Sequence, residues 1–86
     1  MRYDVRLTPA AIRDLDRISP RYVGAIVEFA YGALADYPHR VGKPLRQELE
    51  GLHAARRGDY RVLYEINDDQ VLVHRVDHRS RVYRTR

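Results

Sequence analysis

The chain has 86 residues, 44% of them apolar, and no cysteine, so we expect one compact domain over residues 1–86 without disulfides, thiolate metal sites or a cysteine nucleophile. Its formal net charge of +4 at pH 7 favours a polyanionic partner, either nucleic acid or an acidic protein segment. No apolar run approaches the ~20 residues of a membrane span, and the N-terminus alternates charged and apolar residues, which predicts a cytoplasmic protein with neither signal peptide nor membrane contact.

The N-terminal segment predicts a short strand followed by a helix. Residues 3–7 alternate between apolar and charged side chains, as a half-buried strand requires. Thr8 and Pro9 then supply a helix cap and a first-turn proline, and an apolar stripe continues to Ile18. We therefore expect a helix from Pro9 to Ile18.

A second helix is predicted directly after the first. A Ser-Pro pair at residues 19–20 repeats the start signal, and apolar residues recur with helical spacing from Val23 to Leu34. Pro38 cannot continue a helix and disfavours helical backbone at the residue before it. The second helix should therefore end near Tyr37 and lie antiparallel to the first.

Residues 38–51 read as a connector. Two prolines and two glycines interrupt mixed charges, which predicts an ordered loop with one helical turn at Leu45–Leu49. A strand is expected over His53–Arg57, and Gly58-Asp59 favours a turn or bulge before the next strand.

Residues 60–76 predict a β-hairpin around the turn cluster 67–69. The residues that should face the core are Tyr60, Val62, Tyr64 and Ile66, and the opposite face should carry Arg61, Leu63 and Glu65. Arg61 should therefore face solvent or a ligand.

A last strand around Arg81–Arg84 completes the predicted order β-α-α-β-β-β. In this α+β fold, two N-terminal antiparallel helices pack on one face of a small, mainly antiparallel sheet. The other face of the sheet stays open.

The chain has no common catalytic motif. It contains no P-loop, dinucleotide-binding or zinc-protease pattern, and its four histidines lack metal-ligand spacing, so we expect neither a metal nor another cofactor. The distinctive groups are arginines and tyrosines of the hairpin and the tail. Residues 74–86 carry Arg75, Arg79, Arg81, Arg84 and Arg86 against only Asp77.

Arginine and tyrosine suit metal-free chemistry on RNA. A guanidinium stays protonated and matches phosphate oxygens, so it stabilises a phosphorane. Tyrosine stacks on a splayed base or takes part in proton transfer. Periodicity alone leaves the alternative that Arg61 is a solvated strand residue paired with an acid, and that Tyr83 packs in a terminal strand.

Several motifs together resemble the RelE/ParE toxin superfamily. These are residues 58–66 (GDYRVLYEI), the hairpin turn, residues 76–79 (VDHR) and Val82-Tyr83, preceded by the connector segments 42–45 (GKPL) and 48–51 (ELEG). The resemblance covers nearly the whole chain and agrees with the predicted fold.

The resemblance to RelE-type toxins implies a ribosome-dependent endoribonuclease that cuts mRNA in the A site by 2′-hydroxyl attack. By that resemblance Arg61 stabilises the phosphorane, Arg79 contacts the phosphate and the leaving group, and Tyr83 stacks on the substrate base. Arg56 matches one of two expected basic residues on the preceding strand, whereas Ala54 stands at the other.

The residue that replaces the missing base at Ala54 is open at this point. Arg57 or His53 is a candidate substitute, and His78 is a further candidate for proton transfer because histidine titrates near neutrality. RNA contacts are expected from Arg57, His53, Arg81, Arg84 and Arg86.

Two other functions remain open. ParE toxins share the fold but poison DNA gyrase without cleaving RNA, and a non-catalytic nucleic-acid-binding module would need only the basic tail. The resemblance also implies a cognate antitoxin that covers the region of Arg61, Arg79 and Tyr83 in a hetero-oligomer. The ribosome and its mRNA are the other expected partners.

Overall fold

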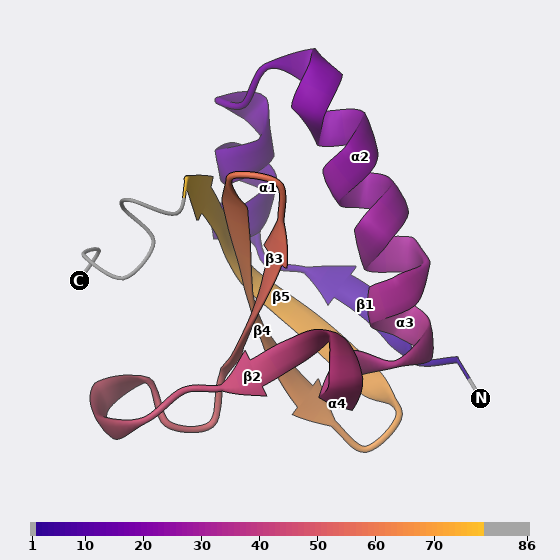
Figure 1. The fold of residues 1–86 in the computed structure, drawn as a ribbon, viewed down its shortest axis with the longest axis vertical. Coiled ribbons are helices and arrows are strands. Elements are labelled where there is room, and N and C mark those ends of the chain that lie inside the picture. Colours follow the sequence, from indigo (N-terminus) through magenta and orange to yellow (C-terminus); the bar gives the residue numbers. More distant parts are fainter. Residues whose placement is uncertain (1, 79–86) are drawn as a thin grey trace.

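The computed structural model describes residues 2–78, and its described part is a five-stranded sheet with helices against one side (Figure 1). The strand order is β1-β5-β4-β3-β2, in which only β1 and β5 run parallel. This arrangement confirms the predicted α+β fold and its mainly antiparallel sheet. The strand expected around Arg81–Arg84 lies outside the described residues.

The first strand and helix follow the prediction closely. Strand β1 spans Asp4–Leu7 and helix α1 spans Pro9–Asp16, so the helix ends two residues before the expected Ile18. The Thr8 hydroxyl accepts from the backbone N–H of Ala11, which caps the helix, and donates to the carbonyl of His74 on β5. Thr8 therefore joins the start of α1 to the sheet.

The second helix is shorter than predicted. Helix α2 spans Pro20–Tyr31, Gly32 breaks it with non-helical backbone angles, and a separate short helix α3 covers Ala33–Asp36. The expectation of one helix up to Tyr37 was therefore wrong. Glycine lowers helix propensity, and a Cβ at Gly32 would lie 2.8 Å from the carbonyl oxygen of Glu28.

The connector holds more regular structure than the expected loop. Pro38 starts a short helix, α4 (Pro38–Val41), because proline is compatible with a first helical turn. Strand β2 (Gly42–Pro44) then pairs antiparallel with β3 (His53–Arg57). The predicted helical turn appears as η1 (Gln47–Leu49) within the expected range.

The predicted hairpin is confirmed, and its second strand is longer than expected. Strand β4 spans Tyr60–Asn67 and β5 spans Gln70–His78, joined by a tight turn at Asp68 and Asp69. The register shifts between Leu63 and Tyr64, where β5 carries one extra residue, His74. Because of this bulge, residues on either side of His74 alternate in opposite phase.

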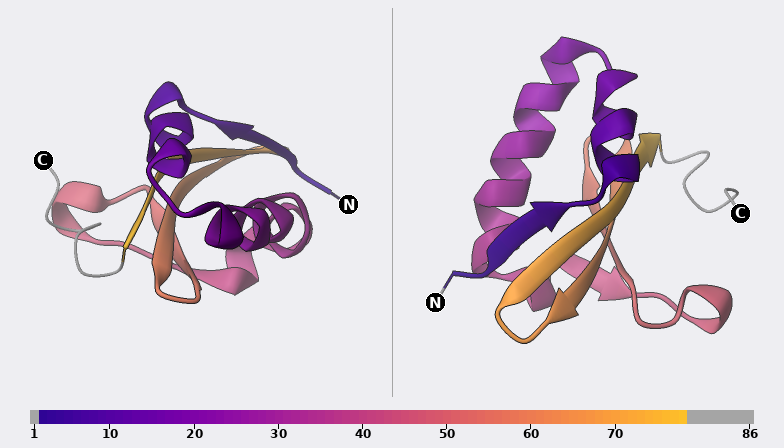
Figure 2. Two further views of the ribbon diagram at one scale, coloured as in Figure 1. Left: turned by 90° about the horizontal axis from the view of Figure 1, so that it is seen from above. Right: turned by 180° about the vertical axis from the view of Figure 1, so that it is seen from behind.

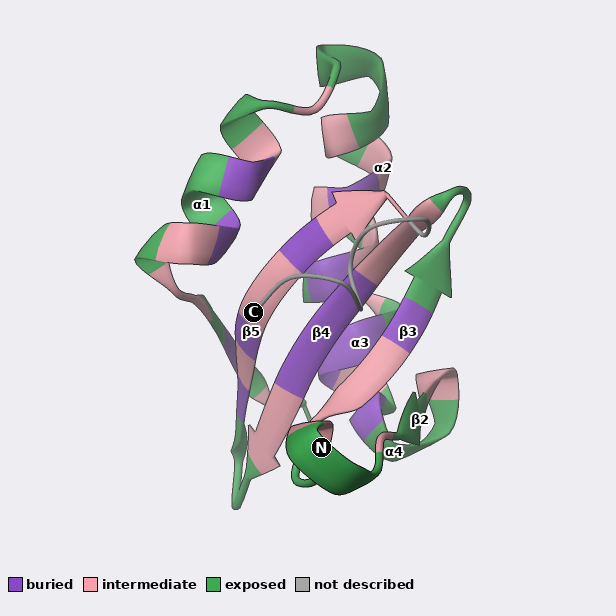
Figure 3. Cartoon of the chain, turned by 90° about the vertical axis from the view of Figure 1, so that its left-hand side faces the viewer, coloured by how far each residue is buried: buried purple, intermediate pink, exposed green. Residues whose placement is uncertain are grey.

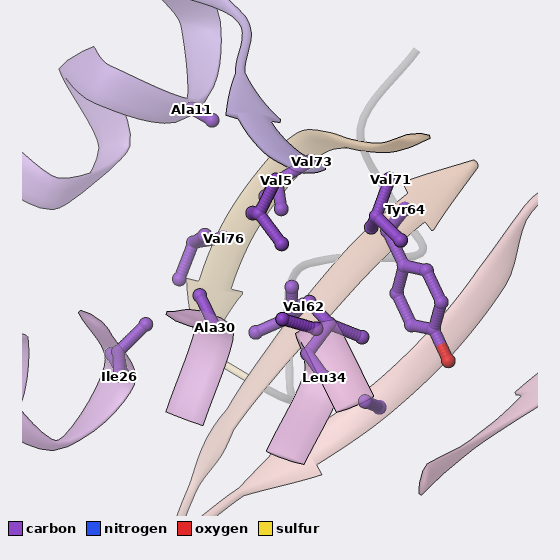
Figure 4. Packing of buried hydrophobic residues seen from close by; sticks show 12 residues of the cluster. Val5, Ala11, Ile26, Ala30, Leu34, Val62, Tyr64, Val71, Val73 and Val76 are labelled. Atoms are coloured by element: carbon purple, nitrogen blue, oxygen red, sulfur yellow. The ribbon is translucent and has the colours of Figure 1, made fainter. Parts of the chain in front are cut away.

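The core lies between the sheet and helices α1, α2 and α3, with α1 packed beside β5 (Figure 2). Val62 and Tyr64 are fully buried in it, as predicted, beside apolar residues of β5, α2 and α3 (Figure 4). Figure 3 shows the opposite side of the sheet, with α2 and α3 behind β3, β4 and β5. On that side Leu63 is only 4% exposed, so the open face is not entirely polar.

Among residues 2–78, no helix is long and apolar enough to cross a membrane. The longest described helix, α2, has twelve residues.

Candidate anion-binding site

Strand register sorts the candidate side chains onto two faces of the sheet. Arg61 on β4 stands opposite Arg56 on β3 and opposite Asp77 on β5, so these three share one face. Val62, the next residue along β4, is buried in the core among the helices. The row of Arg61 therefore lies on the face turned away from the helices, as the alternation predicted.

A pocket of about 470 Å³ opens where β2 begins and the edge of β3 beyond Ala55 is left unpaired. Its basic lining residues come from three parts of the chain, namely α4, β2 and the β3–β4 hairpin: Arg40, Lys43, Arg56 and Arg61. No carboxylate is among the described residues that line it. We call this the cationic pocket.

Arg61 is the most enclosed of the four basic residues. It is half-buried, and its Nη1 atom is buried without a hydrogen-bond partner. Arg56, directly opposite, is exposed and donates a long 3.4 Å hydrogen bond to the carbonyl of Gly58. Like charges opposite one another destabilise a sheet, and a buried unpaired donor adds to that cost. An anion bound between the two guanidinium groups would relieve both.

The position of β2 depends on a buried tyrosine. Tyr64 is fully buried, its hydroxyl donates to the carbonyl of Pro38 at 2.6 Å, and burial raises its pKa to about 12. Gly42 passes so close that a Cβ there would collide with this hydroxyl and lie 2.7 Å from the carbonyl of Ala54. The contact therefore anchors α4 and the start of β2, which carry Arg40 and Lys43.

His53 does not line the cationic pocket. Its ring stacks on Tyr64, with centroids 5.4 Å apart, and meets the His39 ring edge-on at 6.1 Å. Burial, reinforced by the charge of His39, lowers the pKa of His53. Its Nδ1 atom is buried without a hydrogen-bond partner. Its surroundings make His53 part of the support under β2 and β3.

Arg57 and His78 lie together, apart from Arg61. Arg57 stands opposite Tyr60, which stands opposite His78, and all three line a hollow of about 350 Å³ with Tyr22 of α2. The Tyr60 ring lies 5.7 Å from the rings of both Tyr22 and His78. The sequence made His78 a further candidate for proton transfer, and the strand register puts it and Arg61 on opposite faces of the hairpin.

Two pocket residues were missed by the sequence. Arg40 and Lys43 lie in a segment that was expected to be a loop. Strand pairing sets Lys43 opposite Ala54, and Arg40 on α4 lines the same pocket. A signal was available in the chain, because Lys43 is its one lysine. The predicted residues Arg79, Arg81, Tyr83, Arg84 and Arg86 lie outside the described residues.

The described residues form no group of three or more histidine or acidic side chains that could hold a metal ion. The chemistry of the cationic pocket is instead that of fixed guanidinium and ammonium donors, which bind phosphate oxygens well.

Comparison with known proteins finds toxins that are similar to this chain. Residues 5–83 match the family model of the ParE toxin of the type II toxin-antitoxin system parDE. The chain is 55% identical to Toxin RelG of Mycobacterium tuberculosis over 86 residues, covering 98% of this chain and 99% of that protein. It is also 55% identical to Toxin RelE of the same organism over 75 residues, covering 87% and 74%.

Solved structures agree with this similarity. A chain in the crystal structure of the toxin-antitoxin complex RelBE2 from Mycobacterium tuberculosis superposes with a TM-score of 0.90 at 54% identity, covering 93% of this chain and 94% of that one. The archaeal RelE-RelB complex from Pyrococcus horikoshii contains the same fold, with a TM-score of 0.65 at 22% identity over 95% and 100% of the two chains.

Proposed function

The chain belongs to the RelE/ParE family of type II toxin-antitoxin toxins, and on that premise we propose that it is a metal-independent endoribonuclease that cleaves mRNA in the ribosomal A site. The observation that carries the proposal is the cationic pocket, in which Arg61 has a buried nitrogen without a partner opposite a second arginine. Such a site suits a phosphate diester.

The reaction needs charge stabilisation more than a strong nucleophile. The 2′-oxygen of the ribose bonds to phosphorus while the bond from phosphorus to the 5′-oxygen breaks, leaving a 2′,3′-cyclic phosphate. The 2′-hydroxyl loses its proton and the 5′-oxygen gains one. The phosphorane between these steps carries extra negative charge, and preorganised donors such as Arg61 and Arg56 would stabilise it more than the ground state.

Other residues complete the proposed site. Arg79 would contact the leaving group, and Tyr83 would stack on the base next to the cut. Arg81, Arg84 and Arg86 would bind phosphates of mRNA or ribosomal RNA and so add salt-dependent affinity. The earlier candidates Arg57, His53 and His78 remain proposals for RNA contact or proton transfer, from positions outside the cationic pocket.

An antitoxin is the proposed protein partner. Similar chains occur in structures of toxin-antitoxin complexes, RelBE2 among them. An acidic segment of an antitoxin would neutralise the charge of the cationic pocket and exclude RNA from it. Because the antitoxin would bind the folded toxin and not the unfolded chain, it would also stabilise this small domain. A complex that cleaves mRNA as fast as the free toxin would contradict this mode of neutralisation.

The test is cleavage by the purified protein. The toxin is incubated with translating ribosomes, and mRNA 5′ ends are mapped, with the Arg61→Ala variant in parallel. We expect new ends at A-site codons with wild type and none with the variant. Because the matching family description names ParE, supercoiling by DNA gyrase is assayed beside it. Gyrase inhibition without mRNA cleavage would replace the ribonuclease proposal with gyrase poisoning, and RNA binding without either would leave a binding module.

A further inference from the structure

The cationic pocket holds an ammonium group that the strand bearing Arg56 does not supply. Along β3, Ala54 precedes Arg56 by two residues and so lies on the same face of the sheet, where a methyl group is all it offers. The neighbouring strand places Lys43 directly opposite Ala54. Lys43, Ala54, Arg56 and Arg61 all line the pocket.

The face on which Lys43 lies is fixed by its neighbour. Gly42 stands opposite the buried Ala55 and passes against the Tyr64 hydroxyl on the core side. Successive residues of a strand point to opposite faces, so Lys43 points to the face that carries Arg56 and Arg61. A slip of β2 by one residue would put a side chain where only glycine fits, which excludes that register.

The small side chain at residue 54 leaves room for a long one beside it. Residues directly opposite on antiparallel strands have Cβ atoms roughly 4.5–5.5 Å apart, well within the reach of a lysine. Lys43 is exposed, so its ammonium group is free to turn toward an anion held by the half-buried Arg61. An ammonium is a compact charge with three donors and complements the planar fork of arginine.

We propose that Lys43 contacts the reacting phosphate of the RNA from the neighbouring strand, at the place on the sheet that Ala54 leaves empty. The inference rests on the proposed ribonuclease function and adds a residue to its site. The role is electrostatic: the ammonium of Lys43 offsets charge on the non-bridging oxygens of the phosphorane, together with the two guanidinium groups. The positive charge that a basic residue at position 54 would supply therefore comes from Lys43, its partner across the strands.

The test moves the lysine across the pair. Single-turnover cleavage is measured at saturating ribosome concentration for Lys43→Met, Lys43→Arg and the double variant Lys43→Met/Ala54→Lys, with Arg13→Ala as the control that removes an exposed charge outside the pocket. We expect Lys43→Met to slow cleavage about 10–100-fold, and Lys43→Arg and the double variant to stay within about fivefold of wild type. Arg13→Ala should cleave as wild type.

A second measurement does not depend on cleavage. The affinity for an oligonucleotide with a 2′-deoxy nucleotide at the cut site is followed against salt concentration. Lys43→Met should reduce the slope by about one, and the double variant should restore it.

Two results would overturn the inference. One is a wild-type cleavage rate and salt slope in Lys43→Met, and the other is a double variant no better than the single one. If wild type cleaves no RNA, the proposed function fails by itself, and an unchanged slope in Lys43→Met then decides against Lys43 as well.

Discussion

The two edges of the sheet differ in how their charged side chains are paired. At the free edge of β5, beyond the end of β1, Asp14 of α1 is 5% exposed and accepts from Arg75 Nε at 2.8 Å, from Arg75 Nη2 at 3.1 Å and from the Val76 backbone N–H at 2.9 Å. At the other edge, the cationic pocket gathers four basic side chains without a carboxylate among its described lining residues. A carboxylate is thus paired with a guanidinium at the first edge, whereas at the second the nearest carboxylate in the row, Asp77 opposite Arg61, does not line the pocket.

The same contrast appears in the single groups. The hydrogen bonds with Asp14 raise the pKa of Arg75, and those from His74 and Asn67 lower the pKa of Glu65. Arg61, in contrast, keeps a buried nitrogen without a partner. Paired charges close a backbone edge and contribute to folding, whereas like charges gathered in one pocket cost stability and are expected at binding sites. The two edges should therefore respond to mutation in different measurements.

The largest effect should follow from removing Arg61 from the cationic pocket, and it should appear in the cleavage rate. Arg61→Ala removes the half-buried guanidinium and should lower the single-turnover cleavage rate by about 10²–10³-fold, as expected for one preorganised donor to a charged transition state. Urea unfolding should give a free energy within about 0.5 kcal/mol of wild type, because the variant loses both the repulsion by Arg56 on β3 and the attraction to Asp77 on β5. A variant that loses both stability and activity would place Arg61 with the paired charges.

Breaking the ion pair at the first edge should act on folding. Asp14→Ala leaves the Val76 N–H and Arg75 without their acceptor and should lower the free energy of unfolding by about 2–3 kcal/mol. Asp16→Ala, an exposed residue of the same helix, is the control and should change it by less than about 0.5 kcal/mol. Chemical denaturation measures both. Equal stabilities for the two variants would remove the special role of Asp14.

Local sequence signals predicted the helix starts and the faces of β4 better than either edge of the sheet. The alternation in β4 correctly placed Tyr64 in the core and Arg61 on the other face, and the Thr8-Pro9 start signal correctly began α1. Such patterns involve residues that are close in the sequence, so they can be recognised without knowing the three-dimensional structure. The hairpin was predicted for the same reason.

Long-range contacts explain what the sequence did not reveal. The pairing of β2 with β3 depends on the fit of Gly42 against Tyr64, more than twenty residues away, and without it Lys43 reads as a loop residue. The break at Gly32 and the bulge at His74 each interrupt a regular period. Asp14 looked like any polar position of α1, since its partners lie on β5.

A smaller loss of stability should follow from removing the Tyr64 hydroxyl, which holds α4 against β4. Tyr64→Phe removes the hydrogen bond to the Pro38 carbonyl and should lower the free energy of unfolding by about 1–2 kcal/mol. Cleavage should fall only modestly, since β2 loosens without losing a charge. Tyr31→Phe, at a tyrosine that is 49% exposed, serves as the matched control. Unchanged stability in Tyr64→Phe would mean that the hydroxyl does not anchor α4.

The smallest effect concerns pH and the stacked ring of His53. Burial and the charge of His39 lower the pKa of His53 in the folded protein below its ordinary value of 6.5, so near that pH the unfolded chain binds more protons than the folded one. The contribution of His53 to the free energy of unfolding is therefore fully present above pH 6.5 and is lost as the pH falls toward the lowered pKa. His53→Phe keeps an aromatic ring on Tyr64 but does not titrate, and subtracting its urea-unfolding free energy from that of wild type between pH 8 and pH 5 cancels all other groups. The difference should decline on acidification, and His39→Gln should weaken the decline because it removes the repelling charge. If the difference between the two unfolding free energies does not change with pH, the pKa of His53 is the same in the folded and unfolded protein. Protonation of His53 would then not affect the strands that carry the cationic pocket.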